Sequence, residues 1–316
     1  MRNKKAFDLP FSWLFAIIAG SVILILAIYG VSKLIGSMKY EQYTEGAKKL
    51  SILLNPMEAG LASGKSASIK FRTETRTFYD CSITGKNIFG RNLIRFSEKS
   101  GIGEKWAEPG GDIAVYNMYI FANKTEEGKD LWLFSKPFFM GFKVADLIFI
   151  SSRTYCFKDT PNPIKEEVEM LGIKNIKLEN CSEEDVEVCF GKSGCEISVS
   201  GNSEYSSGRV VKNGKSMYYS GSLIFGAIFS TPESYECNVK RLMIKTVQLS
   251  HIYKDKIGFV EKRGCNSNIE PDLNLMINLG NSFSGSEQLA EAEQISKSMN
   301  GKNNNNVYCK IYEVQE

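Results

Sequence analysis

A long run of apolar residues near the N-terminus constrains the fold of this chain more than any other sequence feature. No charged residue occurs from Phe11 to Ser32, and Lys33 is the first one after that stretch. A helix rises about 1.5 Å per residue, so a segment of this length crosses the roughly 30 Å hydrocarbon core of a bilayer. Residues 11–36 are therefore predicted to form a transmembrane helix, and the lipid bilayer is the first expected partner.

A cleaved secretory signal is the alternative interpretation of the same segment. The apolar core of a signal peptide spans about 7 to 15 residues and ends at a cleavage site built from small residues. The segment here is longer, and no A-x-A pattern follows it. We therefore favour a permanent anchor.

Two small residues, Ala16 and Gly20, lie about one helical turn apart inside the predicted span. This spacing allows a second membrane helix to approach closely. The simpler interpretation, which we favour, is the ordinary use of small residues in a membrane helix.

The positions of the cysteines indicate the compartment of the remaining chain. All eight follow the apolar segment: Cys81, Cys156, Cys181, Cys189, Cys195, Cys237, Cys265 and Cys309. Such a set indicates disulfide bonds in an oxidising compartment, with eight independent buried thiols as the alternative. Basic residues nearly balance across the span, so the cysteines decide the orientation. Residues 1–10 are predicted to be a cytoplasmic tail and residues 69–316 a disulfide-stabilised extracytoplasmic domain. Two N-glycosylation sequons, at Asn123 and Asn180, agree with this location.

Cysteine spacing restricts the possible disulfide pairs without fixing them. If residues 233–262 form one helix, Cys237 and Cys265 lie about 40 Å apart, far beyond the roughly 7 Å between Cα atoms that a disulfide allows. Cys265 and Cys309 are better placed to hold the C-terminal part of the chain together. One local bridge is expected among three cysteines that are close in sequence, Cys181, Cys189 and Cys195.

Helical periodicity continues beyond the predicted span. The residues that share one face are Tyr43, Ala47, Leu50 and Leu54. The dipeptide Asn55-Pro56 is expected to end this helix, because the residue before a proline is disfavoured in the α conformation. Residues 37–68 are therefore predicted to form a helical stalk and a linker.

Strand patterns dominate the next part of the chain. From about Ile69 several segments are rich in β-branched and aromatic residues, and some of them alternate with polar residues. The apolar segments 144–152 and 173–178 flank a helical pattern at 163–171, which predicts a strand–helix–strand crossover. Asn213-Gly214 predicts the turn of a β-hairpin.

Helical patterns replace the strands in the last third of the chain. Pro232 begins a long amphipathic pattern, and a second helical stretch runs from Pro271 to about Met299. Residues 301–306 are expected to form a polar loop, and residues 307–314 a closing strand. Strands followed by helices predict an α+β class, with a mostly antiparallel sheet domain covered by the C-terminal helices.

Groups that transfer protons or bind metals are scarce in this chain. His251 is the only histidine, and no G-x-S-x-G motif accompanies it, so we interpret it as a solvated or partly packed side chain. The cysteines at 181, 189 and 195 lack the C-x2-C spacing of zinc sites, and the acidic run 183–187 lacks the residue order of a calcium loop. We expect no metal and no cofactor, and the catalytic residues of any activity are unknown.

Charge argues against one class of partner. The net charge of +3 is too close to neutral to indicate nucleic-acid binding. Basic residues of the long C-terminal helix are expected on its solvated outer face, with contact to anionic lipid or polymer as the alternative. They are Lys240, Arg241, Lys245, Lys254 and Lys256.

The start of the chain also carries a resemblance. A short basic leader with Lys4-Lys5, the junction between Ala6 and Phe7, and the long apolar helix resemble the N-terminus of type IV pilins and pseudopilins. The resemblance implies leader cleavage between Ala6 and Phe7. Phe11 stands where that family usually carries glutamate, and Pro10 interrupts the pattern. The whole chain further resembles uncharacterised single-pass surface proteins of archaea. This second resemblance does not point to any particular activity.

Three functions are compatible with these features. The first is a non-enzymatic component of the cell surface that binds protein partners or takes part in assembly. An anchored extracytoplasmic hydrolase that uses unidentified carboxylates is the second. A pilin-like subunit of a filament or secretion system is the third.

Overall fold

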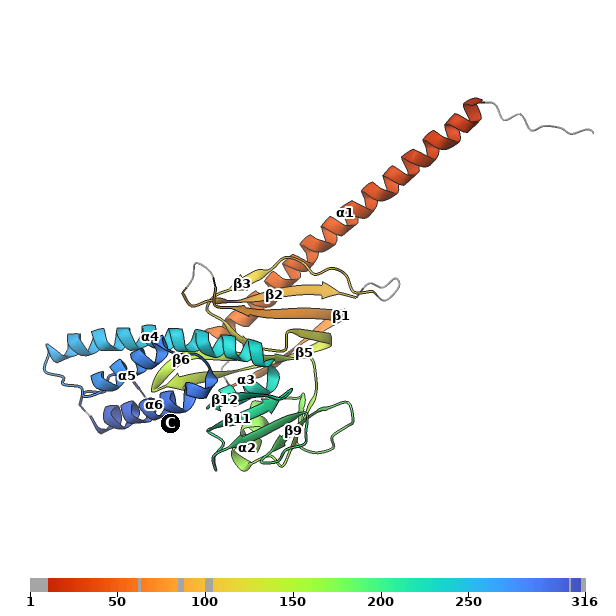
Figure 1. The fold of residues 1–316 in the computed structure, drawn as a ribbon. Coiled ribbons are helices and arrows are strands. Elements are labelled where there is room, and N and C mark those ends of the chain that lie inside the picture. The colour runs from red at the N-terminus through yellow and green to blue at the C-terminus, as the bar shows by residue number, and fades with distance from the viewer. Residues whose placement is uncertain (1–10, 62–63, 85–87, 100–104, 307, 314–316) are drawn as a thin grey trace, which may run out of the picture.

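A computed structural model describes residues 11–61, 64–84, 88–99, 105–306 and 308–313. Its first element is α1, Phe11–Glu58, a single helix of 48 residues. The first half of α1 projects away from the rest of the molecule, and the second half lies against a sheet (Figure 1).

Six strands form the first sheet, in the order β3-β2-β1-β5-β6-β4. Their bounds are β1 Ser66–Ser82, β2 Arg91–Glu98, β3 Ile113–Val115, β4 Tyr119–Phe121, β5 Thr125–Met140 and β6 Phe142–Ser151. Neighbouring strands are antiparallel except for β4 and β6, which are parallel. The long strands β1 and β5 pair from Ser66 with Phe134 to Phe78 with Thr125.

A second sheet of six strands has the order β12-β11-β10-β9-β7-β8. Its strands are β7 Tyr155–Lys158, β8 Ile176–Lys177, β9 Val186–Phe190, β10 Ile197–Gly201, β11 Ser207–Lys212 and β12 Lys215–Ser220. The β10-β11 and β11-β12 pairs are antiparallel, whereas the β10-β9, β9-β7 and β7-β8 pairs are parallel. This sheet is therefore mixed.

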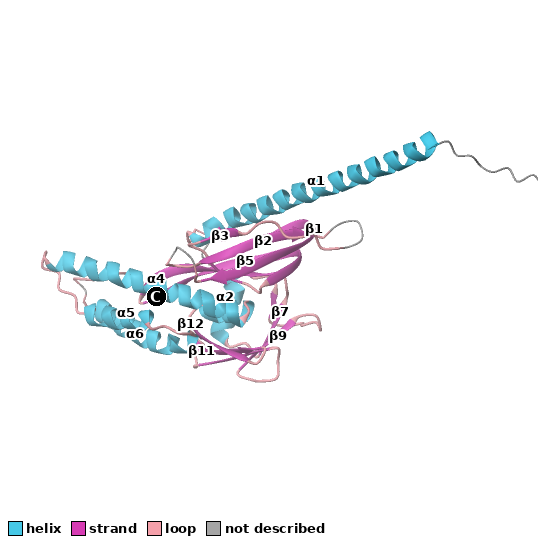
Figure 2. Ribbon diagram, turned by 45° about the horizontal axis from the view of Figure 1, so that its top comes forward, coloured by secondary structure: helices cyan, strands magenta, loops and turns pink. Residues whose placement is uncertain are grey.

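Five further helices complete the fold. They are α2 Asn162–Leu171, α3 Leu223–Phe229, α4 Pro232–Glu261, α5 Glu270–Asn281 and α6 Leu289–Asn305, with a 3-10 turn at Ser286–Gln288. Thr231 caps α4 by accepting a hydrogen bond from Ser234 N, and Pro232 occupies the first turn, where its missing N–H costs nothing. Figure 2 shows α4, α5 and α6 grouped on the side of the first sheet away from α1.

The first sheet separates two apolar cores because both of its faces are covered. In β6, Leu147 and Phe149 belong to the core that includes α3, α4 and the second sheet. The alternate residues Ile148 and Ile150 belong to the core that includes α1. Successive side chains of a strand point to opposite faces, so a strand that is buried on both faces reads as a continuous apolar run.

Several sequence predictions are confirmed. The class is α+β, and strands precede the C-terminal helices. The hairpin turn lies at Asn213 and Gly214, whose φ angles of 51° and 70° are those of a two-residue hairpin loop. The strand–helix–strand crossover is also present, although it runs from β7 through α2 to β8 instead of starting at β6.

Other predictions are wrong. The strands form two sheets, and the second is mixed and not mostly antiparallel, because β7, β8 and β9 run parallel. Helix α6 continues to Asn305 through the expected polar loop, and no closing strand occurs in residues 308–313. Two boundaries differ by only two or three residues from the expected ones: α1 ends at Glu58, where Met57 packs into the core, and β1 begins at Ser66.

Candidate functional site

The first half of α1 presents apolar side chains to its surroundings on every side. Between Phe11 and Gln42 every residue is exposed except Ala19, which is partly exposed. Ile25 and Leu26, near the middle of the apolar stretch, are 64% and 63% exposed. A soluble helix buries such side chains in a core, whereas a membrane helix exposes them to lipid. Among the described residues, α1 is the one helix long and apolar enough to cross a membrane.

The small residues predicted to allow helix packing lie on this projecting half. A Cβ atom added at Gly20 would meet no other atom within 4 Å. Within the described chain, Ala16 and Gly20 therefore face no packed neighbour, and approach of a second helix stays a prediction. The predicted cleavage position at Ala6 and Phe7 lies outside the described residues.

The second half of α1 is part of the domain core. Its buried apolar residues recur at spacings of three and four, as one face of a helix requires: Tyr43, Ala47, Leu50, Leu54 and Met57. They share an apolar cluster with strand residues such as Tyr79, Ile94 and Phe96. The predicted stalk is therefore a docked helix, and the apolar segment continues directly into the packed domain.

A close backbone approach secures this docking. Gly111 N donates a hydrogen bond to Thr44 Oγ1 at 2.8 Å. A Cβ atom at Gly110 would lie 2.4 Å from the backbone nitrogen of Thr44. Only glycine permits such an approach, so the segment before β3 fits tightly against α1.

All eight cysteines form disulfide bonds, and the alternative of independent thiols is wrong. The pairs are Cys81–Cys237, Cys156–Cys181, Cys189–Cys195 and Cys265–Cys309. The exclusion of a bond between Cys237 and Cys265 is confirmed, as are the local bridge and the C-terminal bridge. The partner of Cys81 could not be predicted, because 156 residues separate it from Cys237.

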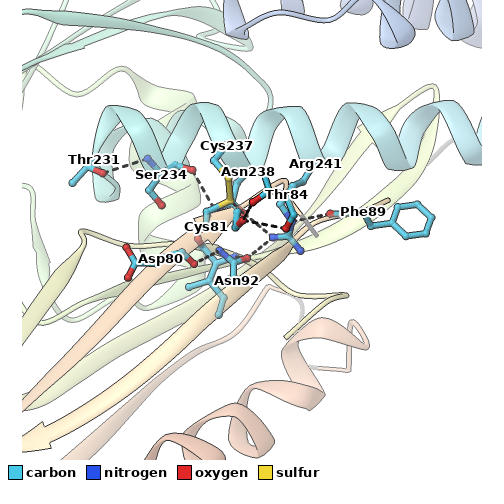
Figure 3. The surroundings of a disulfide bond; sticks show 12 residues. Asp80, Cys81, Thr84, Phe89, Asn92, Thr231, Ser234, Cys237, Asn238 and Arg241 are labelled. Atoms are coloured by element: carbon cyan, nitrogen blue, oxygen red, sulfur yellow. Dashed lines mark hydrogen bonds between the residues drawn. A yellow bond between two sulfur atoms is a disulfide. The ribbon is translucent and has the colours of Figure 1, made fainter. Parts of the chain in front are cut away.

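The bridge between Cys81 and Cys237 joins the first sheet to the helix that covers it (Figure 3). Cys81 lies near the end of β1, and Cys237 lies in the second turn of α4. The two Cα atoms are 6.0 Å apart. A bond between segments so distant in sequence restricts the unfolded chain strongly, so it is expected to contribute more stability than a short-range bridge.

Arg241 is fully buried one helical turn after Cys237, and its guanidinium lies to the side of the bridge, next to Asn238 (Figure 3). The guanidinium donates hydrogen bonds to five oxygen atoms: Phe89 O, Asn92 Oδ1, Tyr116 O, Met118 O and Asn238 Oδ1. None of them belongs to a carboxylate. The charge also lies 4.7 Å from the ring centre of Tyr119.

Burial lowers the pKa of Arg241 to about 10, so the group remains charged at neutral pH. A buried cation is stable only when its donors are satisfied. The five acceptors come from the loop before β2, from β2, from the segment that enters β4, and from α4. Arg241 thus links α4 to the loop before β2, to β2 and to the segment that enters β4.

A second buried cation, Lys212 on β11, is 7% exposed. Its Nζ donates to Asn123 Oδ1, Ile228 O and Ser230 O at 3.2, 3.0 and 3.1 Å. Asn123 Nδ2 donates in turn to Glu126 Oε1 at 2.9 Å. Burial lowers the pKa of Lys212 to about 8 and raises the pKa of Glu126. These groups connect the start of β5 with the second sheet.

The basic residues of α4 differ in exposure: Lys256 is exposed, and Lys240, Lys245 and Lys254 are partly exposed. Arg241 is buried, and Lys245 lies 5.5 Å from the ring centre of Tyr119. Lys254 donates to Asn274 Oδ1 on α5, and Lys256 donates to the backbone oxygen of Ile311. The prediction of an outer charged face is wrong for Arg241, because periodicity alone does not reveal that another segment covers this part of the helix.

The remaining polar residues singled out in the sequence are not brought together. His251 is exposed, and Asp185 of the acidic run accepts hydrogen bonds from Lys177 Nζ and Ser182 N at 2.8 and 2.7 Å. No group of three or more His, Cys, Asp or Glu residues is arranged to hold a metal ion within the described residues.

Three carboxylates line surface pockets, and each has a partner. Asp80 accepts from Arg95 at 2.7 Å, Glu233 pairs with Lys215, and Glu236 accepts from Ser286 N at 2.9 Å. These partnerships are structural contacts between neighbouring elements. These three carboxylates therefore give no support to the hydrolase hypothesis.

Comparison with protein-family models, with curated proteins and with solved structures yields no match to this chain.

Proposed function

We propose that this chain is a single-pass membrane protein that presents a disulfide-stabilised domain outside the cytoplasm, where it acts as a non-enzymatic surface interaction or assembly component. Its N-terminal tail would face the cytoplasm. The expected partners are the lipid bilayer and one or more proteins at the cell surface, and nucleic acid is not among them. The observation that carries the proposal is the division of α1 into an exposed apolar half and a docked half.

The division of α1 has a mechanical consequence. Residues 11–36, which precede the position where polar residues become frequent, form about 39 Å of helix. This length exceeds the roughly 30 Å thickness of the hydrocarbon core. The same helix then continues without interruption into the core at Tyr43. A domain joined in this way keeps a fixed orientation relative to the membrane, which suits a protein that must meet a partner at a defined height and angle.

The disulfides support an extracytoplasmic location for the domain. Four bridges that include every cysteine of the chain are typical of proteins in oxidising compartments. They would be reduced or unformed in most cytosols. The bridges therefore support the proposal that the domain and the short tail lie on opposite sides of the membrane.

Membrane fractionation combined with intact mass tests the anchor. The full chain should stay with membranes after an alkaline wash that strips peripheral proteins, and its mass should include residues 11–36. A chain that is found in the soluble fraction, or whose mass begins after the apolar segment, would show that the segment is a cleaved signal and would overturn the proposal.

A pilin-like subunit is the second candidate, and the division of α1 is compatible with it as well. The exposed apolar first half of α1 and the docking of its second half on a largely antiparallel sheet suit a subunit that assembles through its projecting helix. The same intact-mass measurement separates the two candidates. A mature chain that begins at Phe7 supports the pilin-like subunit, whereas a retained leader supports the permanent anchor.

A further inference from the structure

We propose that Asn180 carries an N-linked glycan in the mature protein, and that the other sequon, at Asn123, is not glycosylated in the folded domain. The inference rests on the proposed extracytoplasmic location, because sequons are modified only outside the cytoplasm. The two sequons are a matched pair within one chain, since they share the acceptor motif and differ in what the fold does with the acceptor amide.

Asn180 is presented to solvent on a fixed turn between β8 and β9. Asn180, Cys181 and Ser182 are all exposed. The side chain of Asn180 makes no hydrogen bond to any residue that the structure describes, and its φ of 55° lies in the left-handed region that asparagine tolerates. Cys181 is bonded to Cys156 in β7, and Ser182 N donates to Asp185 Oδ2 at 2.7 Å. The turn is thus held in place while its acceptor amide stays free.

Asn123 has the opposite environment. Its Nδ2 donates to Glu126 Oε1 at 2.9 Å, and its Oδ1 accepts from Lys212 Nζ at 3.2 Å. Glu126 and Lys212 are 2% and 7% exposed. Asn123 is only partly exposed, and both polar atoms of its amide are engaged in this network. A sugar on Nδ2 would have to be accommodated beside the buried carboxylate of Glu126. The amide of Asn123 therefore has a structural role.

The modification is a glycosyl transfer. A bond forms between Asn180 Nδ2 and the anomeric carbon of the first sugar, and the bond between that carbon and a phosphate oxygen of a lipid-linked oligosaccharide breaks. The lipid phosphate leaves with the bonding electrons, and one amide proton passes to a base. No electrons are gained or lost overall.

The position of Asn180 suggests what the glycan does. Asn180 follows β8 by three residues, and β8 is the terminal strand of the second sheet. An open sheet edge can pair with a strand of another molecule, and proteins commonly block such edges. β8 is only two residues long, which already limits pairing, and a bulky polar glycan beside it would hinder pairing further. Partner proteins would then meet other surfaces of the domain.

The test is peptide mapping by mass spectrometry of the full chain purified from the membranes of its native cell, with free thiols alkylated before any reduction. We expect a glycopeptide that contains Asn180 and an unmodified peptide that contains Asn123. Asn180→Gln and Ser182→Ala should each abolish the glycopeptide, whereas Ser182→Thr should retain it, since threonine completes the motif as well as serine.

The thiol labels separate two kinds of failure. If the cysteines are disulfide-bonded and Asn180 is unmodified, the glycan inference is wrong while the proposed location stands. If all eight thiols are alkylated, the proposed function fails and the inference fails with it. A glycan found on Asn123 in the folded protein would also contradict the inference.

Discussion

At the scale of single residues, Arg241 is the feature of this molecule that sequence patterns most misrepresent. It lies on a helix with a solvated face, yet it is completely buried and bound by five oxygen atoms. Three of these oxygens belong to the backbone of segments far away in the sequence. A guanidinium is suited to this role because its planar fork presents several donors in fixed directions.

Replacement of Arg241 should therefore destabilise the fold strongly. We expect Arg241→Met to lower the free energy of unfolding by about 3 kcal/mol, because buried carbonyl groups lose their donors. The matched control is Arg209→Met at an exposed position. This control should change the free energy of unfolding by less than about 0.5 kcal/mol. Urea unfolding of both variants in detergent gives the comparison. Equal small effects would mean that Arg241 is dispensable.

The lowered pKa of Lys212 predicts how the stability of the fold depends on pH. Burial lowers its pKa in the folded protein to about 8, against 10.5 in the unfolded chain. Between these values the unfolded chain binds a proton that the folded protein has lost, so this residue makes stability rise with pH, by at most about 1.4 kcal/mol per pH unit. Below about pH 8 both states are protonated and the slope vanishes.

The measurement is the free energy of unfolding from pH 7 to 9.5 for the wild type and for Lys212→Met. The wild type should gain stability relative to Lys212→Met above about pH 8. Lys174→Met, at an exposed position, should follow the wild type in parallel at every pH. Parallel curves for all three proteins would contradict the assignment of a lowered pKa to Lys212.

At the scale of elements, α1 combines two environments that the sequence distinguishes only in part. The apolar run to Lys33 predicts the projecting half directly. The face formed by Tyr43, Ala47, Leu50 and Leu54 was also visible, but its partner was not. Periodicity identifies which side of a helix is buried and not which element covers it, so a docked helix was predicted to be a stalk.

Two adjacent leucines test the docking of α1. Leu54 is fully buried, whereas Leu53 is 59% exposed. We expect Leu54→Ala to lower the free energy of unfolding by about 3 kcal/mol through lost burial and a cavity. Leu53→Ala should change it by less than about 0.5 kcal/mol. Thermal unfolding in detergent, or protease resistance of the domain, measures both. Similar losses for the two variants would argue against docking.

The disulfides provide a second comparison between elements. In the chain-entropy model, a bridge that closes a loop of 156 residues contributes about 5 kcal/mol, and one that closes a loop of 6 residues contributes about 2 kcal/mol. Replacing Cys81 and Cys237 together by serine should therefore destabilise the protein more than replacing Cys189 and Cys195. The urea midpoints of the two double variants measure these losses of stability. An equal or larger loss on removing the short bridge would contradict the prediction.

The sheets show where sequence reasoning ends. The Asn213-Gly214 hairpin and the crossover through α2 follow from local signals. The division of the strands between two sheets does not, because β6 and β7 are neighbours in the chain and belong to different sheets. Strand pairing over long distances depends on the whole fold. The same holds for the Asn123–Glu126–Lys212 network, because Lys212 lies 89 residues after Asn123.

At the scale of the whole molecule, the features form one arrangement. An apolar helix half projects from a domain, the other half lies in that domain's core, and four disulfides hold the remaining elements (Figure 1). The proposed surface role, the pilin-like alternative and the glycan at Asn180 all depend on the same orientation. Each requires the domain to lie on the oxidising side of the membrane.

Differential alkylation of intact membranes, followed by mass mapping without reduction, tests that orientation most directly. We predict that no cysteine reacts with the first alkylating reagent, and that the peptides of Cys81 and Cys237 are recovered as a linked pair along with three other pairs. Recovery of the chain from membranes with its cysteines carrying the first reagent would place the domain in a reducing compartment and contradict the proposed function.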